Sequence, residues 1–169
     1  MKKILFYLVF QAASFVSNAQ TLSLNELIDK SSCDDFNCIN ESITNRGFCF
    51  LNTKKKSSGT LYTYESCYEN GTRSDFIFTK YDNNSTASSI GTESESYVRN
   101  LLSQLKQMGF KAVKTDDSNT RVTSVTYRSP IYSRITIELA TSRSNDLEST
   151  SQYYRLTCMR QANQSGQRF

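Results

Sequence analysis

Apolar and polar residues alternate from Ile131 to Thr141, and this alternation limits the possible folds more than any other feature of the chain. Successive side chains of an extended strand point to opposite faces. One face here would carry Ile131, Ser133, Ile135, Ile137 and Leu139, and the other would carry Tyr132, Arg134, Thr136 and Glu138. A strand of this kind belongs to a sheet that is covered on one face only, which is typical of antiparallel sheets.

Six further segments have the composition of strands. They are rich in aromatic and β-branched residues, which fit a pleated sheet. Polar clusters that favour turns separate them, among them Asn70-Gly71 and the run 116–119. Together with 131–141, the expected strands are 48–52, 60–68, 75–81, 110–114, 121–128 and 153–160.

Two short helices are expected before the first strand. Ser23 and Glu26 have the spacing of a capping box, in which the two side chains bond to each other's backbone N–H groups. A second apolar repeat at helical spacing predicts a helix at 34–45. Gly47 follows it and supplies a left-handed stop.

The longest helix is expected to begin at Thr92, which has the capping-box spacing with Glu95. Apolar residues recur on one side of it as far as Met108. Gly109 ends it in the same way that Gly47 ends the preceding helix.

The two halves of the chain share an order of elements, namely a helix, a Gly-Phe pair, a short strand, a turn and two longer strands. An offset of 62 residues places Gly47-Phe48 on Gly109-Phe110. This match indicates either an internal repeat, 23–82 and 92–160, or the general tendency of helices that lead into strands to end in Gly. Both interpretations predict an α+β fold with helices packed on one face of antiparallel sheet, since short connections cannot make parallel crossovers.

The N-terminus has the composition of a secretory signal peptide. Lys2 and Lys3 precede a short apolar run, and Ser17-Asn18-Ala19 offers small residues at a cleavage site. We therefore expect a signal peptide at 1–19, export to the periplasm or the extracellular medium, and a single α+β domain at 20–169. After cleavage the chain carries 18 basic and 16 acidic residues, and it has no later long apolar segment. We therefore expect neither a nucleic-acid partner nor membrane insertion of the mature chain.

Five cysteines lie in the expected mature part, and exported thiols usually pair. Two disulfides and one free thiol allow fifteen connectivities, among which the sequence alone does not select. Short separations favour Cys33–Cys38, around the first turn of a helix, and Cys49–Cys67, on neighbouring strands. Cys158 would then be a free, buried thiol without reactivity.

The chain contains no histidine, which removes the Ser-His-Asp and Cys-His mechanisms and the usual zinc sites. The acidic pairs Asp34-Asp35, Glu93/Glu95 and Asp116-Asp117 are the remaining candidates for acid–base chemistry. Positions at helix N-termini and in a turn explain them more simply, so we assign no catalytic residue. The sequence also lacks the spacing of a metal site and a glycine-rich phosphate loop, and we expect no metal and no cofactor.

Tyrosines on strands, interleaved with Ser, Thr and Arg, are the positive feature that remains. Rigid tyrosine side chains on an open sheet face suit a protein or glycan partner, although cross-strand packing is the simpler explanation for most tyrosines on strands. The residues expected at such a surface are Tyr132, Tyr153, Arg134 and Arg155.

The tandem order of elements resembles, at the level of the fold, small secreted inhibitor and envelope-binding proteins, and the leader resembles those of small exported bacterial proteins. The leading hypothesis is an exported, soluble, non-catalytic binding module that engages a protein or glycan of the cell envelope. The alternatives are a histidine-free hydrolase that cleaves glycans through two carboxylates and a structural envelope protein.

Overall fold

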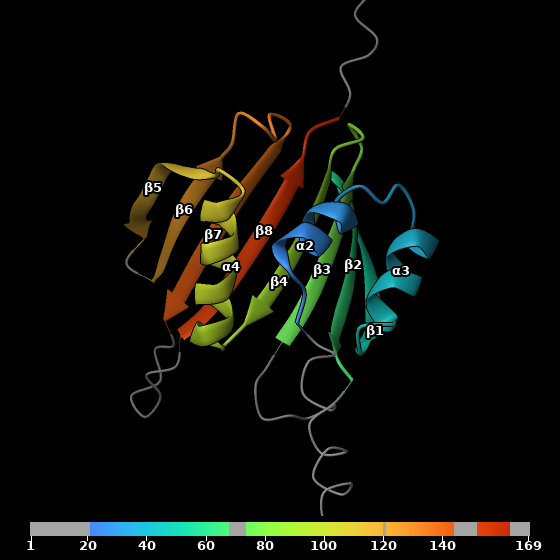
Figure 1. Ribbon diagram of the computed structural model, residues 1–169. Helices are drawn as coiled ribbons and strands as arrows, with labels where there is room; N and C mark the ends of the chain where they lie inside the picture. Colours follow the sequence, from blue (N-terminus) through green and yellow to red (C-terminus); the bar gives the residue numbers. More distant parts are fainter. Residues whose placement is uncertain (1–20, 68–73, 120, 144–151, 163–169) are drawn as a thin grey trace, which may run out of the picture.

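The computed structural model describes residues 21–67, 74–119, 121–143 and 152–162, and in them helices pack on one face of an antiparallel sheet (Figure 1). The expected α+β class is confirmed. The helices are α2 (Leu24–Lys30), α3 (Phe36–Thr44) and α4 (Glu95–Gln107). The strands are β1 (Phe48–Lys56), β2 (Gly59–Ser66), β3 (Ser74–Tyr81), β4 (Thr86–Thr92), β5 (Lys111–Asn119), β6 (Val122–Arg128), β7 (Ile135–Arg143) and β8 (Gln152–Arg160). None of the helices in the described ranges is long and apolar enough to cross a membrane.

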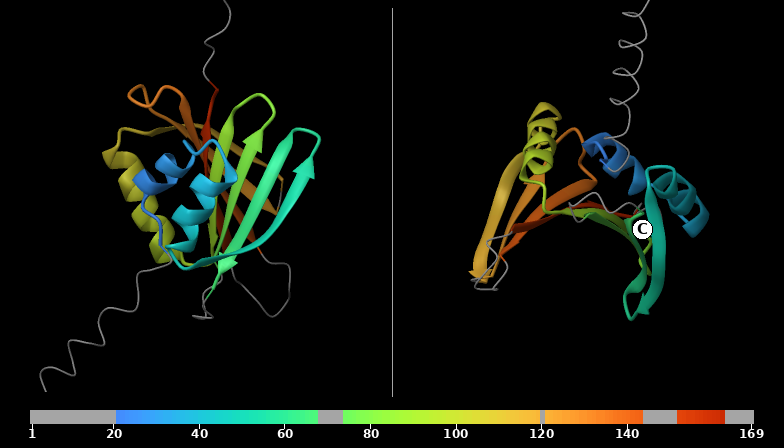
Figure 2. Two further views of the ribbon diagram at one scale, coloured as in Figure 1. Left: turned by 90° about the vertical axis from the view of Figure 1, so that its right-hand side faces the viewer. Right: turned by 90° about the horizontal axis from the view of Figure 1, so that it is seen from below.

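The eight strands form a single sheet in the order β1-β2-β3-β4-β8-β7-β6-β5, and every neighbouring pair is antiparallel. Each half of the chain is a meander of four strands that follows a helix. The two halves meet where β4 pairs with β8. Seen from below, the sheet is an arch with the helices on its outer side, and no described helix covers the concave side (Figure 2).

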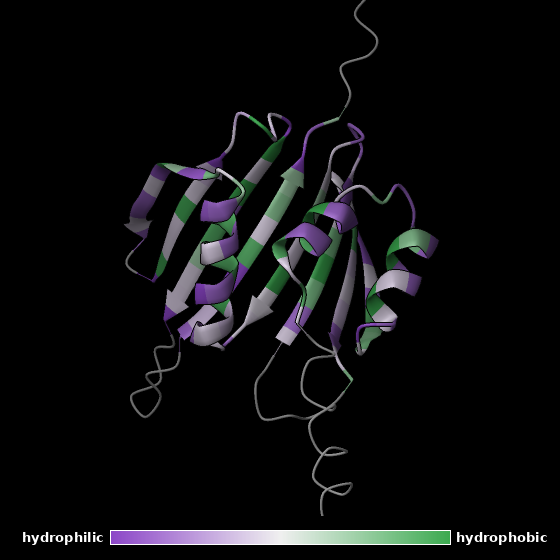
Figure 3. Ribbon diagram, viewed as in Figure 1, coloured by the Kyte–Doolittle hydropathy of each residue, from purple (hydrophilic) through white to green (hydrophobic). Residues whose placement is uncertain are grey.

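The core lies between the helices and the outer side of the arch. The sides of α2 and α4 that point away from the sheet are hydrophilic (Figure 3). Their apolar sides are buried together with Ile39 and Ile43 of α3. These helices pack on large side chains of the sheet, which include Phe48, Tyr64, Phe76, Phe78, Ile90, Ile137 and Leu156.

The helix ends follow the sequence signals with one exception. The capping box of Ser23 and Glu26 is confirmed. Gly47 and Gly109 both have positive φ, at 82° and 75°, as expected for residues that end a helix in the left-handed conformation. The expected start of α4 at Thr92 is wrong, because Ser94 is its N-cap and Thr92 ends β4.

Three expectations about strands need correction. The strand β4 was not expected at all, the run 116–119 continues β5 in place of a turn, and residues 131–134 form a turn before β7. The sequence of β4 gives no apolar alternation because two of its inward side chains are hydroxyls that bond to the end of α2. Ser88 Oγ donates to the Leu27 carbonyl at 2.6 Å, and Thr86 Oγ1 donates to the Ser31 carbonyl.

The halves of the chain correspond more closely than the sequence indicated. A shift of 62 residues brings the bounds of β1, β2 and β3 to within one residue of those of β5, β6 and β7. The fourth strands, β4 and β8, do not follow this shift. An internal duplication stays a prediction. The expected signal peptide and the Asn70-Gly71 turn lie outside the described residues.

Candidate functional site

The concave side of the sheet, here called the open face, carries the residues that alternate with the core positions of each strand. In the central strands these are Asp75, Ile77 and Thr79 of β3, Ala87, Ser89 and Gly91 of β4, and Tyr153, Arg155, Thr157 and Met159 of β8. Hydroxyl groups and small side chains dominate this set. Ser89 Oγ lies 2.9 Å from Thr157 Oγ1 across the seam between the halves.

The strand β4 is the most deeply buried strand of the open face. All seven of its residues are buried, including Ala87 and Ser89, which point away from the helices. Their small side chains extend less far from the sheet than the larger side chains of β3 and β8. The exposed side chains at the centre of the open face therefore belong to β3 and β8, the two neighbours of β4.

A polar cluster crosses β4 at one end of the open face. Arg155 Nη2 donates to Asp75 Oδ2 at 2.8 Å and to the Tyr153 hydroxyl at 3.1 Å. The same hydroxyl donates to Asp75 Oδ1. The Arg155 guanidinium also lies 5.6 Å from the centroid of the Tyr153 ring, within the range of a cation–π contact. We call these three residues the Asp75 cluster.

The Asp75 cluster depends on the absence of a side chain at residue 91. Gly91 is the cross-strand partner of both Asp75 and Arg155. A Cβ at this position would lie 1.9 Å from Asp75 Oδ1 and 1.9 Å from the Tyr153 hydroxyl. Atoms cannot approach so closely, so the cluster occupies the space that glycine leaves.

One donor of the Asp75 cluster has no acceptor among the residues that the structure describes. Arg155 Nη1 is buried, and none of these residues accepts a hydrogen bond from it. The ion pair itself remains partly open to solvent, since the side chains of Arg155 and Asp75 are 28% and 22% exposed. A buried N–H group without an acceptor is costly, and native proteins usually satisfy such groups with water or a ligand.

The structure brings together two of the four residues expected at the binding surface. Tyr153 and Arg155 share the open face, whereas Tyr132 and Arg134 lie in the turn before β7. The expected placement of Tyr132 on the open face is wrong, because its ring stacks on Phe110 of the core with centroids 5.4 Å apart and 15° between the planes. Arg134 donates to the Gln161 carbonyl at 2.7 Å.

Asp75 was not among the expected residues, although the sequence contained a signal for it. Phe76 and Phe78 are buried on the helix side of β3, and a strand period of two places Asp75 and Ile77 on the other face. The contact between Asp75 and Arg155 could not be inferred in the same way. It forms because β4 pairs with both β3 and β8, and the sequence does not predict β4.

Four of the five cysteines form the two expected disulfides, Cys33–Cys38 and Cys49–Cys67. Cys158 is free and buried, with its Sγ 3.6 Å from Ser31 Oγ. Burial raises the pKa of this thiol to about 11. The thiolate that attacks electrophiles or binds metals is therefore scarce at neutral pH.

One residue of each acidic pair considered for catalysis has a structural partner. Asp35 caps α3 by accepting from the Cys38 N–H at 2.8 Å. Glu95 forms an ion pair with Arg99 one helical turn away. Hydrogen bonds from Ser118 lower the pKa of Asp116. Within the described ranges, the residue types that commonly bind metals nowhere form a group of three or more.

Several strand tyrosines belong to the helix side of the sheet. Tyr64 is fully buried beside Phe76, and burial raises its pKa to about 12. Tyr62 stacks on Phe78, and Tyr127 packs against the core. Cross-strand packing therefore explains these tyrosines, and Tyr153 is the one of those expected at a binding surface that the open face presents.

Comparisons of the chain with protein-family models, with curated proteins and with solved structures found no match.

Proposed function

We propose that this chain is an exported, non-catalytic binding module that engages a protein of the cell envelope or its surroundings through the open face. The pairing of four cysteines in disulfides supports export, because such bonds persist in oxidising compartments. The arched sheet supports a binding role, because it presents a wide concave surface opposite the helices (Figure 2).

The observation that carries the proposal is the Arg155 side chain, which is 28% exposed on the open face and has one N–H group, Nη1, without an acceptor among the described residues. Because Nη1 itself is closed off from solvent, an acceptor reaches it when a partner packs against the exposed part of this side chain and shifts it. Carbonyl and carboxylate oxygens of a polypeptide are suitable acceptors. The unpartnered group would then contribute to binding instead of weakening the fold.

The composition of the Asp75 cluster favours a protein over a glycan. Tyrosine and arginine are enriched among the residues that dominate protein–protein binding energies, especially where they are packed and partly desolvated. Asp75 holds the Arg155 side chain in place, so little side-chain entropy is lost when a partner binds. The surrounding hydroxyls add adaptable hydrogen bonding without adding charge.

Quantitative affinity capture tests the proposal. The chain without residues 1–19 is immobilised and exposed to envelope and secreted proteins of its host, in parallel with a Tyr153→Phe/Arg155→Met variant. We expect the variant to retain at least about tenfold less of the partner than the wild type does, since a hydrogen bond to a charged group contributes about 1.5–3 kcal/mol.

The matched control is Tyr154→Phe/Arg99→Met, which makes the same changes on the helix side. Tyr154 packs against the core, and Arg99 is an exposed residue of α4. Circular dichroism verifies that both variants fold. A partner retained equally by the wild type and both variants would exclude the open face as the binding surface, and binding of glycans alone would exclude a protein partner.

A further inference from the structure

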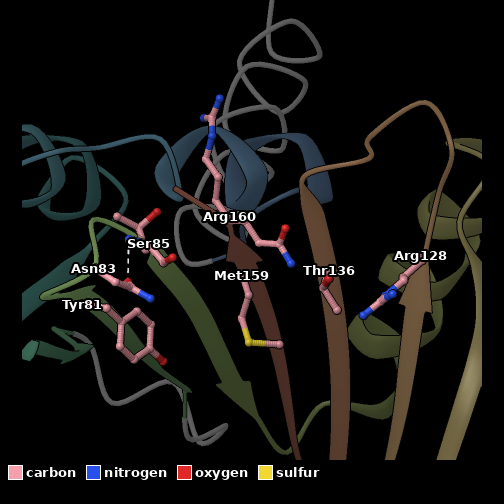
Figure 4. A pocket seen from close by; sticks show the side chains of 9 residues that line it. Tyr81, Asn83, Ser85, Arg128, Thr136, Met159 and Arg160 are labelled. Carbon is pink, nitrogen blue, oxygen red and sulfur yellow. Dashed lines mark hydrogen bonds between the residues drawn. The ribbon is translucent and has the colours of Figure 1, made fainter. Parts of the chain in front are cut away.

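A separate pocket of about 340 Å³ lies at the other end of the open face (Figure 4). Its lining includes Tyr81 at the end of β3, Arg128 at the end of β6, Thr136 near the start of β7 and Met159 near the end of β8. Its volume is at the lower end of the range for small-molecule sites, about 300–1,000 Å³. A fragment-sized ligand fits such a space.

The register of the sheet places three of the lining residues side by side. Arg128, Thr136 and Met159 are successive cross-strand partners, so their side chains form one row on the open face. The next residue of the row is Ala87, whose methyl group leaves space beside Met159. Tyr81 stands beyond this space. Figure 4 shows Arg128 pointing toward Thr136 and Met159, with the Tyr81 ring on the other side of Met159.

The rim next to Tyr81 is fixed by hydrogen bonds in the turn between β3 and β4. The Tyr81 N–H donates to the Ser85 carbonyl at 2.9 Å, and the Ser85 N–H donates to Asn83 Oδ1 at 2.9 Å. The Ser85 hydroxyl accepts from the Ala162 N–H at 3.2 Å, which ties the turn to the chain after β8. These hydrogen bonds hold the Tyr81 side of the pocket in place without a ligand.

Arg128 brings an uncompensated positive charge to the pocket. Within the described residues, no carboxylate forms an ion pair with its guanidinium and no acceptor bonds to it. The other guanidinium of the lining, that of Arg160, points away from Arg128 and donates to Ser32 Oγ (Figure 4). A single planar cation thus faces a mostly apolar space.

We propose that this pocket binds a small carboxylate that carries an aromatic or branched aliphatic group. Arg128 would take the carboxylate through two parallel hydrogen bonds, the geometry in which a guanidinium recognises this group best. The Tyr81 ring and the Met159 thioether contact the apolar body of the ligand, and sulfur–aromatic contacts add to this packing. The inference uses no residue of the Asp75 cluster and is independent of the proposed function.

Methyl NMR of methionine tests the proposal with 3-phenylpropionate as the probe. Without residues 1–19 the chain has two methionines, Met159 in the pocket and Met108 at the end of α4. We expect the Met159 methyl signal to shift on titration and the Met108 signal to stay in place. The uncharged 3-phenylpropionamide should bind at least about tenfold more weakly, because it lacks the charge that the guanidinium recognises.

Two variants complete the test. Arg128→Gln should weaken binding of the acid about tenfold and leave binding of the amide unchanged, whereas Arg143→Gln, an exposed arginine at the end of β7, should change neither. A peptide with a free C-terminal phenylalanine distinguishes the two sources of such a carboxylate. Tighter binding than the small acid identifies a polypeptide terminus, and weaker binding identifies a free acid.

Three results would overturn the inference. These are an unshifted Met159 methyl signal at saturating probe, equal affinity for the acid and the amide, and an Arg128→Gln variant that binds the acid as the wild type does. Loss of protein binding at the Asp75 cluster would leave all three readouts unaffected.

Discussion

Replacing Gly91 by alanine tests whether the Asp75 cluster is built on the space above β4. The new methyl group would lie 1.9 Å from both Asp75 Oδ1 and the Tyr153 hydroxyl, so these oxygens must move. The backbone itself tolerates alanine, because Gly91 is not among the described glycines with positive φ. The predicted cost therefore comes from the side chains alone.

The magnitude follows from the contacts that are lost. A hydrogen bond to a charged group contributes about 1.5–3 kcal/mol, and the partial exposure of Asp75 and Arg155 favours the lower end of this range. Alanine returns about 0.4–1 kcal/mol by restricting the unfolded chain. We therefore expect Gly91→Ala to lower the free energy of unfolding by about 1 kcal/mol, which corresponds to about 2–4 °C in Tm for a chain of this length.

Urea unfolding followed by circular dichroism measures this change. The same substitution is then made in an Asp75→Ala/Tyr153→Ala background, where the atoms that would clash with the methyl group are absent. There we expect Gly91→Ala to be neutral or to stabilise by up to about 1 kcal/mol. An equal cost in both backgrounds would refute the steric argument, since independent sites give additive changes.

Three further predictions concern stability and reactivity. Removing the Cys49–Cys67 bridge, which spans 18 residues, should cost about 3 kcal/mol in urea unfolding, and removing the other disulfide, which spans 5, should cost about 2 kcal/mol; equal costs would contradict the loop-entropy account. The Cys158 thiol should resist a thiol reagent at pH 8 until the chain unfolds, because a pKa raised from 9.0 to about 11 leaves about a hundredfold less thiolate; rapid labelling of the folded chain would contradict this. Burial raises the pKa of Tyr64 and Tyr97 from 10.0 to about 12, so the folded state holds these protons more tightly than the unfolded chain does. These groups should leave the free energy of unfolding unchanged below about pH 10 and lower it between about pH 10 and 12. A titration at 295 nm combined with urea unfolding measures this fall, and Tyr97→Phe should reduce it.

The sequence predicted the parts of the fold in which local signals and burial agree. The capping box at Ser23, the glycine stops at Gly47 and Gly109, and the strands rich in aromatic residues all act through neighbouring residues. Short separations along the chain favoured the two disulfides that form, although the sequence alone allowed fifteen connectivities.

The sequence predicted neither β4 nor the position of Tyr132 correctly, because the environment of these residues comes from distant parts of the chain. Thr86 and Ser88 look like turn residues until the carbonyls of α2 accept their hydroxyls. Tyr132 has the sequence pattern of an alternating strand, but its ring stacks on Phe110 and packs against the core. In both cases a contact made by the fold overrides the local pattern.

The pairing of β4 with β8 has a consequence for how the chain acquires its structure. The strands within each half pair with neighbours that are close along the chain, whereas Thr86 meets Arg160 across more than seventy residues. Contacts between residues so far apart in sequence form slowly, and the strand needed here is the last one described. Because the first half of the chain emerges before the second, it can form a four-stranded intermediate with an exposed edge, and this edge stays unpaired until β8 pairs with β4.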